Sequence, residues 1–456
     1  MMMRCRSLAA SSSARTFRHR CWTPPPRRLA STAAPTPLPS EGALTVACGI
    51  AFFVAAERST GAALSACELN LPSHVTALCV LGGFAAVPSI GVHLQRLLGP
   101  ATAWLRASLP CTLVPAFLFP VMCELPSGDA LPKLAALAAG SAIITCAATG
   151  HIAAALVRGV PLAVATPCIS SVSAAAAVSS SPLFGFAALT CGSLLSAAIY
   201  TWHPAASTAV TRAPAYIGLT VALYVASARC LPPAIRRFAP PNVACAIALL
   251  PLLLATGGSA EVRTYLDGAG AALLDAVKPA MVTLGLYAHT HRAVMRSQMA
   301  ALAGLAFVIA PAILFGVARA GASLNLEPAH VAAILPASTT TGLALTMPAG
   351  MPLIRTEWVA AGTAFNSFLV QVTLPLLMGV TMLRTPFSRG VGIGCTGHVG
   401  GMAALLAAGE SAAADAAAVA LVVVGVARSV LVQVPAFSRA LTDACGQSDV
   451  RSCTGK

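Results

Sequence analysis

Two stretches of small polar residues and glycine interrupt long apolar segments in the C-terminal half of the chain. The first covers residues 335–342 (LPASTTTG) and the second covers residues 394–401 (GCTGHVGG). Lipid cannot satisfy a free backbone N–H or C=O group, so a helix interrupted at membrane depth normally lines a protected cavity. A pair of such segments in one membrane domain indicates the substrate site of a secondary transporter.

The first stretch has the chemistry of an anion site. A broken helix exposes N–H groups and a partial positive charge at the start of its second half. The hydroxyls of Ser338, Thr339, Thr340 and Thr341 can donate to a carboxylate or a substrate hydroxyl, and Gly342 lets the backbone approach a ligand. The alternative is that these hydroxyls bond back to helix carbonyls and only bend the helix.

The second stretch adds an ionisable group. His398 is placed inside an apolar span, where such groups are rare and are treated as functional candidates. It could donate to an anion or carry the proton of a symport cycle; the alternative is a buried histidine with a structural role. Thr396, Gly397, Gly400 and Gly401 are the accompanying candidates for substrate binding, since glycine permits close backbone approach.

Another candidate is Asn366, which lies within a separate apolar segment. Its amide could face the substrate, or it could make hydrogen bonds between helices. We find no Cys/His cluster with metal-ligand spacing and predict no metal or cofactor. Paired intramembrane carboxylates and nucleophile motifs are also missing from the sequence, so an enzyme is not expected.

The elements that position these residues are transmembrane helices. Hydrophobic residues make up 57% of the chain and charged residues 9%, whereas a soluble domain has about 25% charged residues. The net charge is +14. The basic residues are scattered at segment ends and have no aromatic residues between them, which argues against nucleic-acid binding. We therefore predict an all-α polytopic membrane protein with about 12 or 13 spans of roughly 17–25 residues. They lie near 43–56, 73–93, 101–122, 133–157, 183–201, 214–230, 242–257, 269–288, 298–318, 329–349, 357–380, 391–408 and 413–436.

The predicted domain plan begins with an organelle transit peptide. Residues 1–40 are rich in arginine and serine and contain neither lysine nor an acid, which is typical of such peptides. Composition does not distinguish a plastid from a mitochondrion. We predict a four-helix module at 41–158, a linker at 159–182, a transport domain at 183–437 and a polar tail at 438–456.

Several segments resemble, in order, motifs of the LrgA/LrgB family. Residues 273–282 (LLDAVKPAMV) look like its LLxPAxV segment, and 334–341 (ILPASTTT) look like its LPKSVTT segment. Residues 366–371, 396–403 and 429–436 resemble further LrgB elements, and residues 71–78 (LPSHVTAL) resemble an LrgA element. The ordered set is specific, whereas any one motif is not.

The resemblance implies an LrgA-like module followed by an LrgB-like domain with inverted repeats and two discontinuous helices. It implies alternating-access transport of small monocarboxylates such as glycolate and glycerate across a plastid inner envelope, as in photorespiration. The mitochondrial inner membrane is the second choice. The alternatives are a holin/antiholin-like pore or regulator of lysis, and a pyruvate/lactate-type carrier. The expected partners are the substrate and the lipid bilayer, with proton coupling and homo-oligomerisation left open.

One departure from the family concerns the charge of the site. Ala337 stands where the family usually has lysine or arginine. Lys278, inside another segment, could replace that cation, or it could extend to the membrane interface. Arg355 is a second candidate, although a loop ion pair is the alternative there. We therefore expect an anion site built from hydroxyls and backbone, with the charge either relocated or missing.

Overall fold

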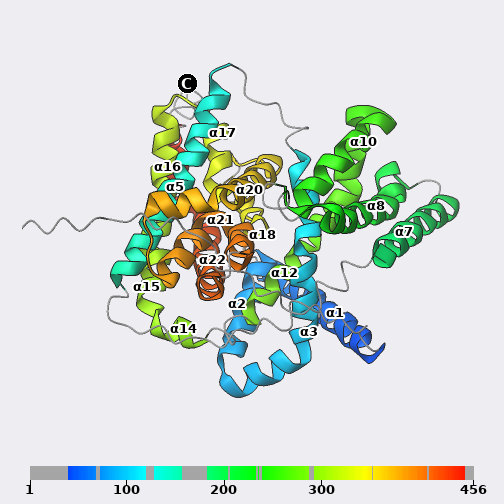
Figure 1. Cartoon of the computed structure of the whole chain (residues 1–456), viewed down its shortest axis with the longest axis horizontal. Coiled ribbons are helices and arrows are strands. Elements are labelled where there is room, and N and C mark those ends of the chain that lie inside the picture. Colours follow the sequence, from blue (N-terminus) through cyan, green and yellow to red (C-terminus); the bar gives the residue numbers. More distant parts are fainter. Residues whose placement is uncertain are drawn as a thin grey trace, which may run out of the picture. The chain divides into compact units, whose positions relative to one another are not determined.

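The computed structural model describes residues 40–67, 72–119, 128–156, 182–203, 206–232, 235, 239–286, 292–351, 353–407 and 410–446. Residues 1–39 of the predicted transit peptide and nearly all of the predicted linker lie outside this described part. Every regular element within the described part is a helix (Figure 1), which confirms the all-α polytopic class.

The helices of the first half are mostly long, and those of the second half include several short pieces. In chain order the first are α1 (Ser40–Ala66), α2 (Ser73–Ala86), α3 (Pro88–Thr112), η1 (Val114–Phe117), α5 (Ala130–Leu156), α7 (Pro182–Trp202), α8 (Thr208–Cys230) and α10 (Pro241–Tyr265). Next come η2 (Leu266–Gly270), α11 (Ala271–Asp275), α12 (Val277–Val282), η3 (Thr283–Leu286), α14 (Arg292–Ser297), α15 (Met299–Gly304), η4 (Leu305–Ile309) and α16 (Ala310–Ser323). The last are α17 (Pro328–Ile334), η5 (Leu335–Ser338), α18 (Thr341–Ala344), α19 (Met347–Gly350), α20 (Thr356–Thr381), α21 (Pro386–Ala407), α22 (Ser411–Gln433) and α23 (Pro435–Ala444).

The number of spanning helices is lower than predicted. Within the described residues, five helices are long and apolar enough to cross a membrane, or six if one bent pair counts as a span. That pair is α2 and the first part of α3, and the chain bends by 118° between them. Pro88 begins the second helix there, because proline lacks the N–H group that would continue α2. Two causes lower the number: the span over residues 241–286 contains two predicted segments, and long helices such as α1, α20 and α21 are not among the five.

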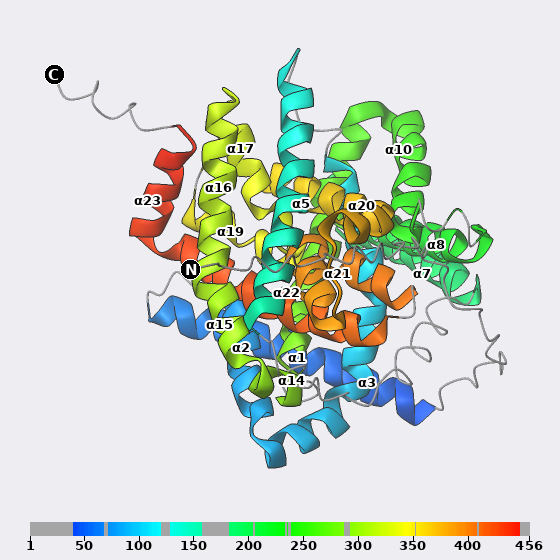
Figure 2. The same cartoon turned by 60° about the vertical axis from the view of Figure 1, so that its left-hand side comes forward.

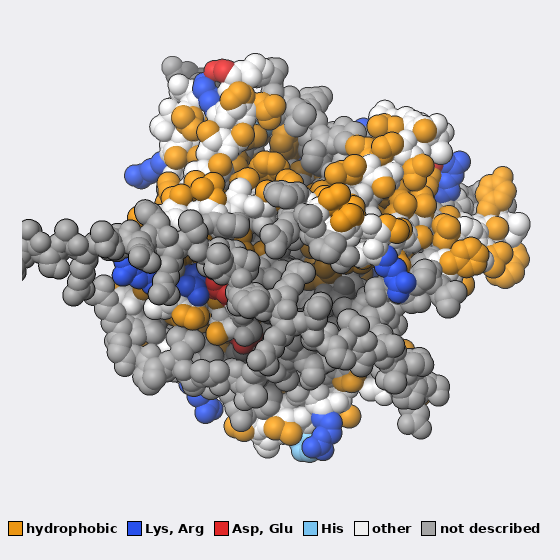
Figure 3. Space-filling view, viewed as in Figure 1, with side chains coloured by type: hydrophobic (Ala, Val, Ile, Leu, Met, Phe, Trp, Pro, Cys, Tyr) orange, Lys and Arg blue, Asp and Glu red, His pale blue; other side chains and the backbone are white. Residues whose placement is uncertain are grey.

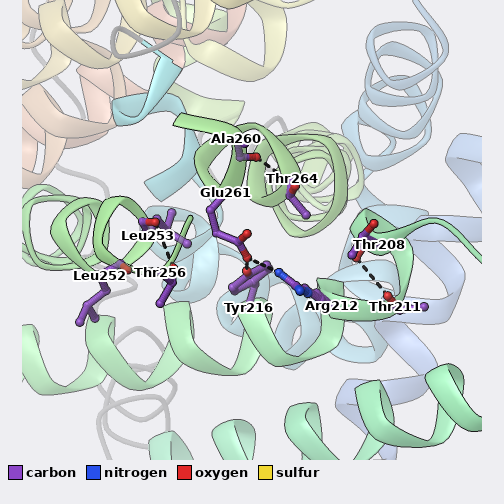
Figure 4. Close-up of polar contacts among 10 residues, drawn as sticks. All are labelled: Thr208, Thr211, Arg212, Tyr216, Leu252, Leu253, Thr256, Ala260, Glu261 and Thr264. Atoms are coloured by element: carbon purple, nitrogen blue, oxygen red, sulfur yellow. Dashed lines mark hydrogen bonds and ion pairs between the residues drawn. The ribbon is translucent and has the colours of Figure 1, made fainter. Parts of the chain in front are cut away.

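Helix α10 changes direction at a glycine pair. Gly257 and Gly258 have non-helical backbone angles, and φ of Gly258 is +65°, a region that glycine enters without steric cost. The part of α10 after this turn is tied to α8 (Figure 4). Glu261 accepts hydrogen bonds from Tyr216 and from Arg212, whose Nη1 lies 2.6 Å from Oε1.

The two predicted modules are packed together in one compact unit, residues 35–456. Helices α1, α2 and α3 of the N-terminal part contact α12 of the C-terminal part. Helix α5 lies against α20 and α21 (Figure 2). The predicted polar tail, residues 438–456, begins inside α23, where Ser438 and Leu441 are buried. The division into an LrgA-like and an LrgB-like module stays a prediction from sequence.

Apolar side chains cover much of the described surface in the view of Figure 3. Large exposed ones on α7 include Phe186, Tyr200 and Trp202, and Phe307 is exposed on η4. Such an outer face is suited to contact with lipid, since lipid tails are as apolar as these side chains. The polar groups that could bind a substrate must therefore be sought inside the packed helices.

Candidate functional site

The first predicted interruption is present. Helix α17 ends at Ile334 and continues as the 3₁₀-helix η5, after which Thr339 (φ −124°, ψ 145°) and Thr340 (φ −59°, ψ 140°) are not helical. The short helices α18 and α19 follow. We call residues 335–350 the broken segment. The four residues of α18 are too few for a strong helix dipole, so the partial positive charge expected at this point from sequence is small.

Carbonyl oxygens of the broken segment accept hydrogen bonds from side chains of other helices. Such partners are needed wherever a helix is broken away from water. The bonds are Asn366 Nδ2 to Ala337 O (2.7 Å), Arg428 Nη1 to Ser338 O (2.5 Å), His74 Nε2 to Gly342 O (3.0 Å), Ser429 Oγ to Leu343 O (3.0 Å), Gln433 Nε2 to Thr346 O (2.9 Å) and Ser438 Oγ to Gly350 O (2.5 Å). The donors come from α2, α20, α22 and α23, so four helices hold the segment in place.

The hydroxyls at the break have different partners. Thr341 Oγ1 lies 3.0 Å from Thr363 Oγ1 on α20. Ser338 Oγ accepts from Arg428 Nη1 at 2.6 Å. The hydroxyl of Thr339 is buried and has no hydrogen-bond partner among the described residues. These bonds run to neighbouring helices, and they differ from the back-bonding to the residue's own helix that we weighed as the alternative.

A small cavity adjoins the break. It has a volume of about 20 Å³ and is lined by Thr340 and Thr341 together with Asn242, Ser367 and three apolar residues. A volume of this size holds about one water molecule. The cavity places two of the predicted hydroxyl residues beside an amide and another hydroxyl.

Asn366 joins the two predicted stretches. Its Nδ2 donates to Ala337 O at 2.7 Å and to Thr396 O at 2.6 Å, and its side chain is only 3% exposed. The structure therefore brings Asn366, Thr396 and the start of the break together. In this arrangement the amide links α20 to η5 and α21, which is the structural role that we weighed as its alternative.

The second predicted stretch lies within α21, Pro386–Ala407. The two ends of α21 lie close together: Arg389 Nε is 2.7 Å from Glu410 Oε2, and a Cβ on Gly401 would lie 3.5 Å from Ile393 O. Residues eight apart in a straight helix are about 12 Å apart, so α21 turns back between Ile393 and Gly401, which supports the predicted interruption. Its glycines serve close packing: a Cβ on Gly394 would overlap Ala417 O on α22, and one on Gly400 would overlap Ser367 Oγ on α20. Small residues allow this approach between membrane helices. Thr396 Oγ1 bonds back to Gly392 O at 2.8 Å.

Two further candidates in α21 have helical backbone, but their surroundings are not described. The side chains at positions 397–399 lie outside the described residues. The predicted role of His398 in anion or proton binding therefore stays a prediction, as does that of Gly397. Gly401 packs against Val370 of α20 and against Ile393, which lies earlier in α21 itself.

The sequence analysis missed Arg428. This residue lies in the C-terminal half of α22, five residues before its end at Gln433, and its side chain is completely buried. Nη1 is bound to Ser338, whereas Nε and Nη2 have no hydrogen-bond partner within the described part of the chain. A signal was available in the sequence, because Arg428 lies inside the apolar run predicted at 413–436, and charged residues within a span mark functional sites by default.

Lys278 makes an ion pair with Asp275 on the neighbouring turn, with 2.7 Å between Nζ and Oδ1, and its side chain is 45% exposed. This arrangement favours a role at the helix surface, and the replacement of the family's cation by Lys278 stays a prediction. Arg355, the second candidate, is an exposed residue at the start of α20.

The comparisons with known proteins agree with this architecture. The chain is 23% identical over 430 residues to the plastidal glycolate/glycerate translocator 1 of Arabidopsis thaliana, covering 88% of this chain and 81% of that protein. It is 32% identical over 111 residues to the antiholin-like protein LrgB of Bacillus subtilis (strain 168), covering 24% of this chain and 47% of that protein. No solved structure matches the chain. The model of the LrgB-like family matches residues 220–437, which include the broken segment and Arg428. This region of the chain is similar to the LrgB-like family, as its motifs predicted.

Proposed function

We propose that the protein is a secondary transporter of small hydroxymonocarboxylates, such as glycolate and glycerate, working by alternating access in a plastid inner envelope. One observation carries the proposal: a helix is broken inside the protein, between α20 and α22, with hydroxyl groups at the break and a small cavity beside it. Irregular backbone at membrane depth is tolerated where it lines a binding site.

The chemistry of the break favours an oxygen-rich anion. Hydroxyl, amide and guanidinium groups are donors that carboxylate and hydroxyl oxygens accept. The similarity to a glycolate/glycerate translocator extends over most of both chains and supports this substrate class. The arginine-rich residues 1–40 support import into an organelle, and the chloroplastic location in the name of that relative favours a plastid.

Uptake by the purified full chain in proteoliposomes tests the proposal. Labelled glycolate, glycerate, pyruvate and lactate are offered with and without the same compound inside, and with and without a pH gradient. We expect saturable glycolate or glycerate uptake that internal substrate accelerates if transport is exchange, or that an inward proton gradient accelerates if it is symport. Equal, non-saturable fluxes of unrelated solutes would instead indicate the pore suggested by the antiholin-like relative.

A further inference from the structure

We propose that the Arg428 guanidinium binds the carboxylate of the transported anion through its Nε and Nη2 groups. The inference rests on the proposed function, because it names the residue that recognises the substrate at the same break. It also answers the question raised by Ala337: the positive charge is carried by α22, which packs against the break.

The burial of Arg428 requires a compensating group. Its side chain is 0% exposed, and no Asp or Glu in the described part of the chain forms an ion pair with it. Removing a charge from water is costly unless it is paired and its hydrogen-bonding groups are satisfied. A carboxylate ligand meets both requirements.

The free donors of Arg428 have the geometry that a carboxylate needs. Nη1 is held by the carbonyl and the hydroxyl of Ser338, at 2.5 and 2.6 Å, which fixes the plane of the guanidinium. The free groups, Nε and Nη2, form one edge of that plane. Two parallel N–H bonds from such an edge to both oxygens of one carboxylate are the arrangement that arginine favours.

Thr339 offers a second point of contact. Its side chain is 2% exposed and its hydroxyl is unpartnered within the described residues. Its Cγ2 lies 3.8 Å from the place where Gly425 would carry a Cβ, so the Thr339 side chain lies against the turn of α22 that precedes Arg428. Helical side chains lean toward the N-terminus of their helix, which directs Arg428 toward the same turn. The hydroxyl of a 2-hydroxy acid could bond there.

The number of buried cationic side chains determines how many carboxylates the bound anion should have. Among the residues that the structure describes, Arg428 is the only buried arginine or lysine. A second carboxylate on the ligand would therefore be desolvated without a cation, which is costly. We expect monocarboxylates of two or three carbons to bind and dicarboxylates of similar size to bind less tightly.

Equilibrium binding of labelled glycolate to the purified full chain in nanodiscs tests the inference, with glycolamide as a neutral competitor. We expect Arg428→Gln to weaken glycolate binding by at least about tenfold, because two hydrogen bonds to a charged group are lost. The affinity of Arg428→Gln for glycolamide, measured by competition, should change much less. This variant should therefore no longer prefer glycolate, which has a carboxylate, over glycolamide, which has none. Arg428→Lys should be intermediate, and Arg439→Gln, which removes an exposed cation from α23, should bind glycolate normally.

A second pair of variants covers the case in which Arg428 variants do not fold. Thr339→Val removes the free hydroxyl with almost no change of shape, and Thr145→Val removes another buried, unpartnered hydroxyl from α5. We expect weaker glycolate binding for the first and normal binding for the second. Unchanged glycolate affinity in Arg428→Gln, or equal affinities in the two valine variants, overturns the inference.

Measuring both binding and transport distinguishes the failure of the proposed transport function from the failure of the assignment of Arg428. If the wild-type chain binds glycolate through Arg428 but moves no monocarboxylate across the bilayer, the transport function is wrong and the anion site stands. If it transports glycolate and Arg428→Gln does so with an unchanged KM, the transport function stands and the assignment of Arg428 is wrong.

Discussion

Replacing Asn366 with leucine should destabilise the protein by disconnecting three elements at once. The amide of Asn366 donates to Ala337 O on η5 and to Thr396 O on α21, at 2.7 and 2.6 Å, from a buried position on α20. Each hydrogen bond contributes about 0.5–1.5 kcal/mol net, so the loss of two predicts about 1–3 kcal/mol. Leucine has a similar volume, so little of the effect should come from a cavity.

The assay is reversible unfolding of the full chain in mixed micelles, followed by circular dichroism, with glycolate uptake measured in parallel. Thr373→Val is the matched control on the same helix, since Thr373 Oγ1 bonds only to Leu369 O of α20 among the described contacts. Its free energy of unfolding should change by about 0.5 kcal/mol or less. If Asn366→Leu is as stable as this control, the amide does not hold the break and the reasoning fails.

Three other predictions concern contacts between helices. His74→Ala should raise the KM for glycolate because His74 bonds to Gly342 O at the break, whereas His151→Ala, which removes a similar bond to Thr381 O, should leave KM unchanged in the same uptake assay. Gly394→Leu should cost about 1–3 kcal/mol or more by overpacking, since α22 leaves no room there, while Gly379→Leu faces open space and should unfold like the wild type. Glu261→Gln should weaken the tie between α8 and α10 by about 1 kcal/mol, and this loss should shrink in high salt because Arg212 is half exposed.

Local sequence predicted the first interruption because its residues are poor at continuing a helix. Pro336 removes one backbone donor, and Ser338 to Thr341 can bond in non-helical conformations. The second interruption was predicted from its glycines, and the closeness of Gly401 to Ile393 supports a turn of the chain there. Glycine has a second use in membrane helices, which the sequence alone did not predict: Gly394 and Gly400 also admit a neighbouring helix.

The cation of the candidate site was missed for a related reason. The sequence predicted Lys278 and Arg355 as candidate cations but did not indicate Arg428. Arg428 lies in an uninterrupted apolar helix, and its distance from Ser338 along the chain is 90 residues. Only packing brings them together. A charge within a span was a sufficient signal by itself, but its partner could not be derived from the sequence.

The geometry of the break depends more on distant residues than on residues 335–342. Proline at position 336 removes one intrahelical hydrogen bond, and a helix can survive that loss when neighbours satisfy the freed carbonyl. The non-helical angles at Thr339 and Thr340 persist alongside donors from α2, α20 and α22: His74, Asn366, Arg428, Ser429 and Gln433. Each donor offers a carbonyl a partner outside the helix. A change in the shape of the break must therefore exchange these bonds, which makes the donors, rather than the threonines, the positions where substitution should alter its conformation.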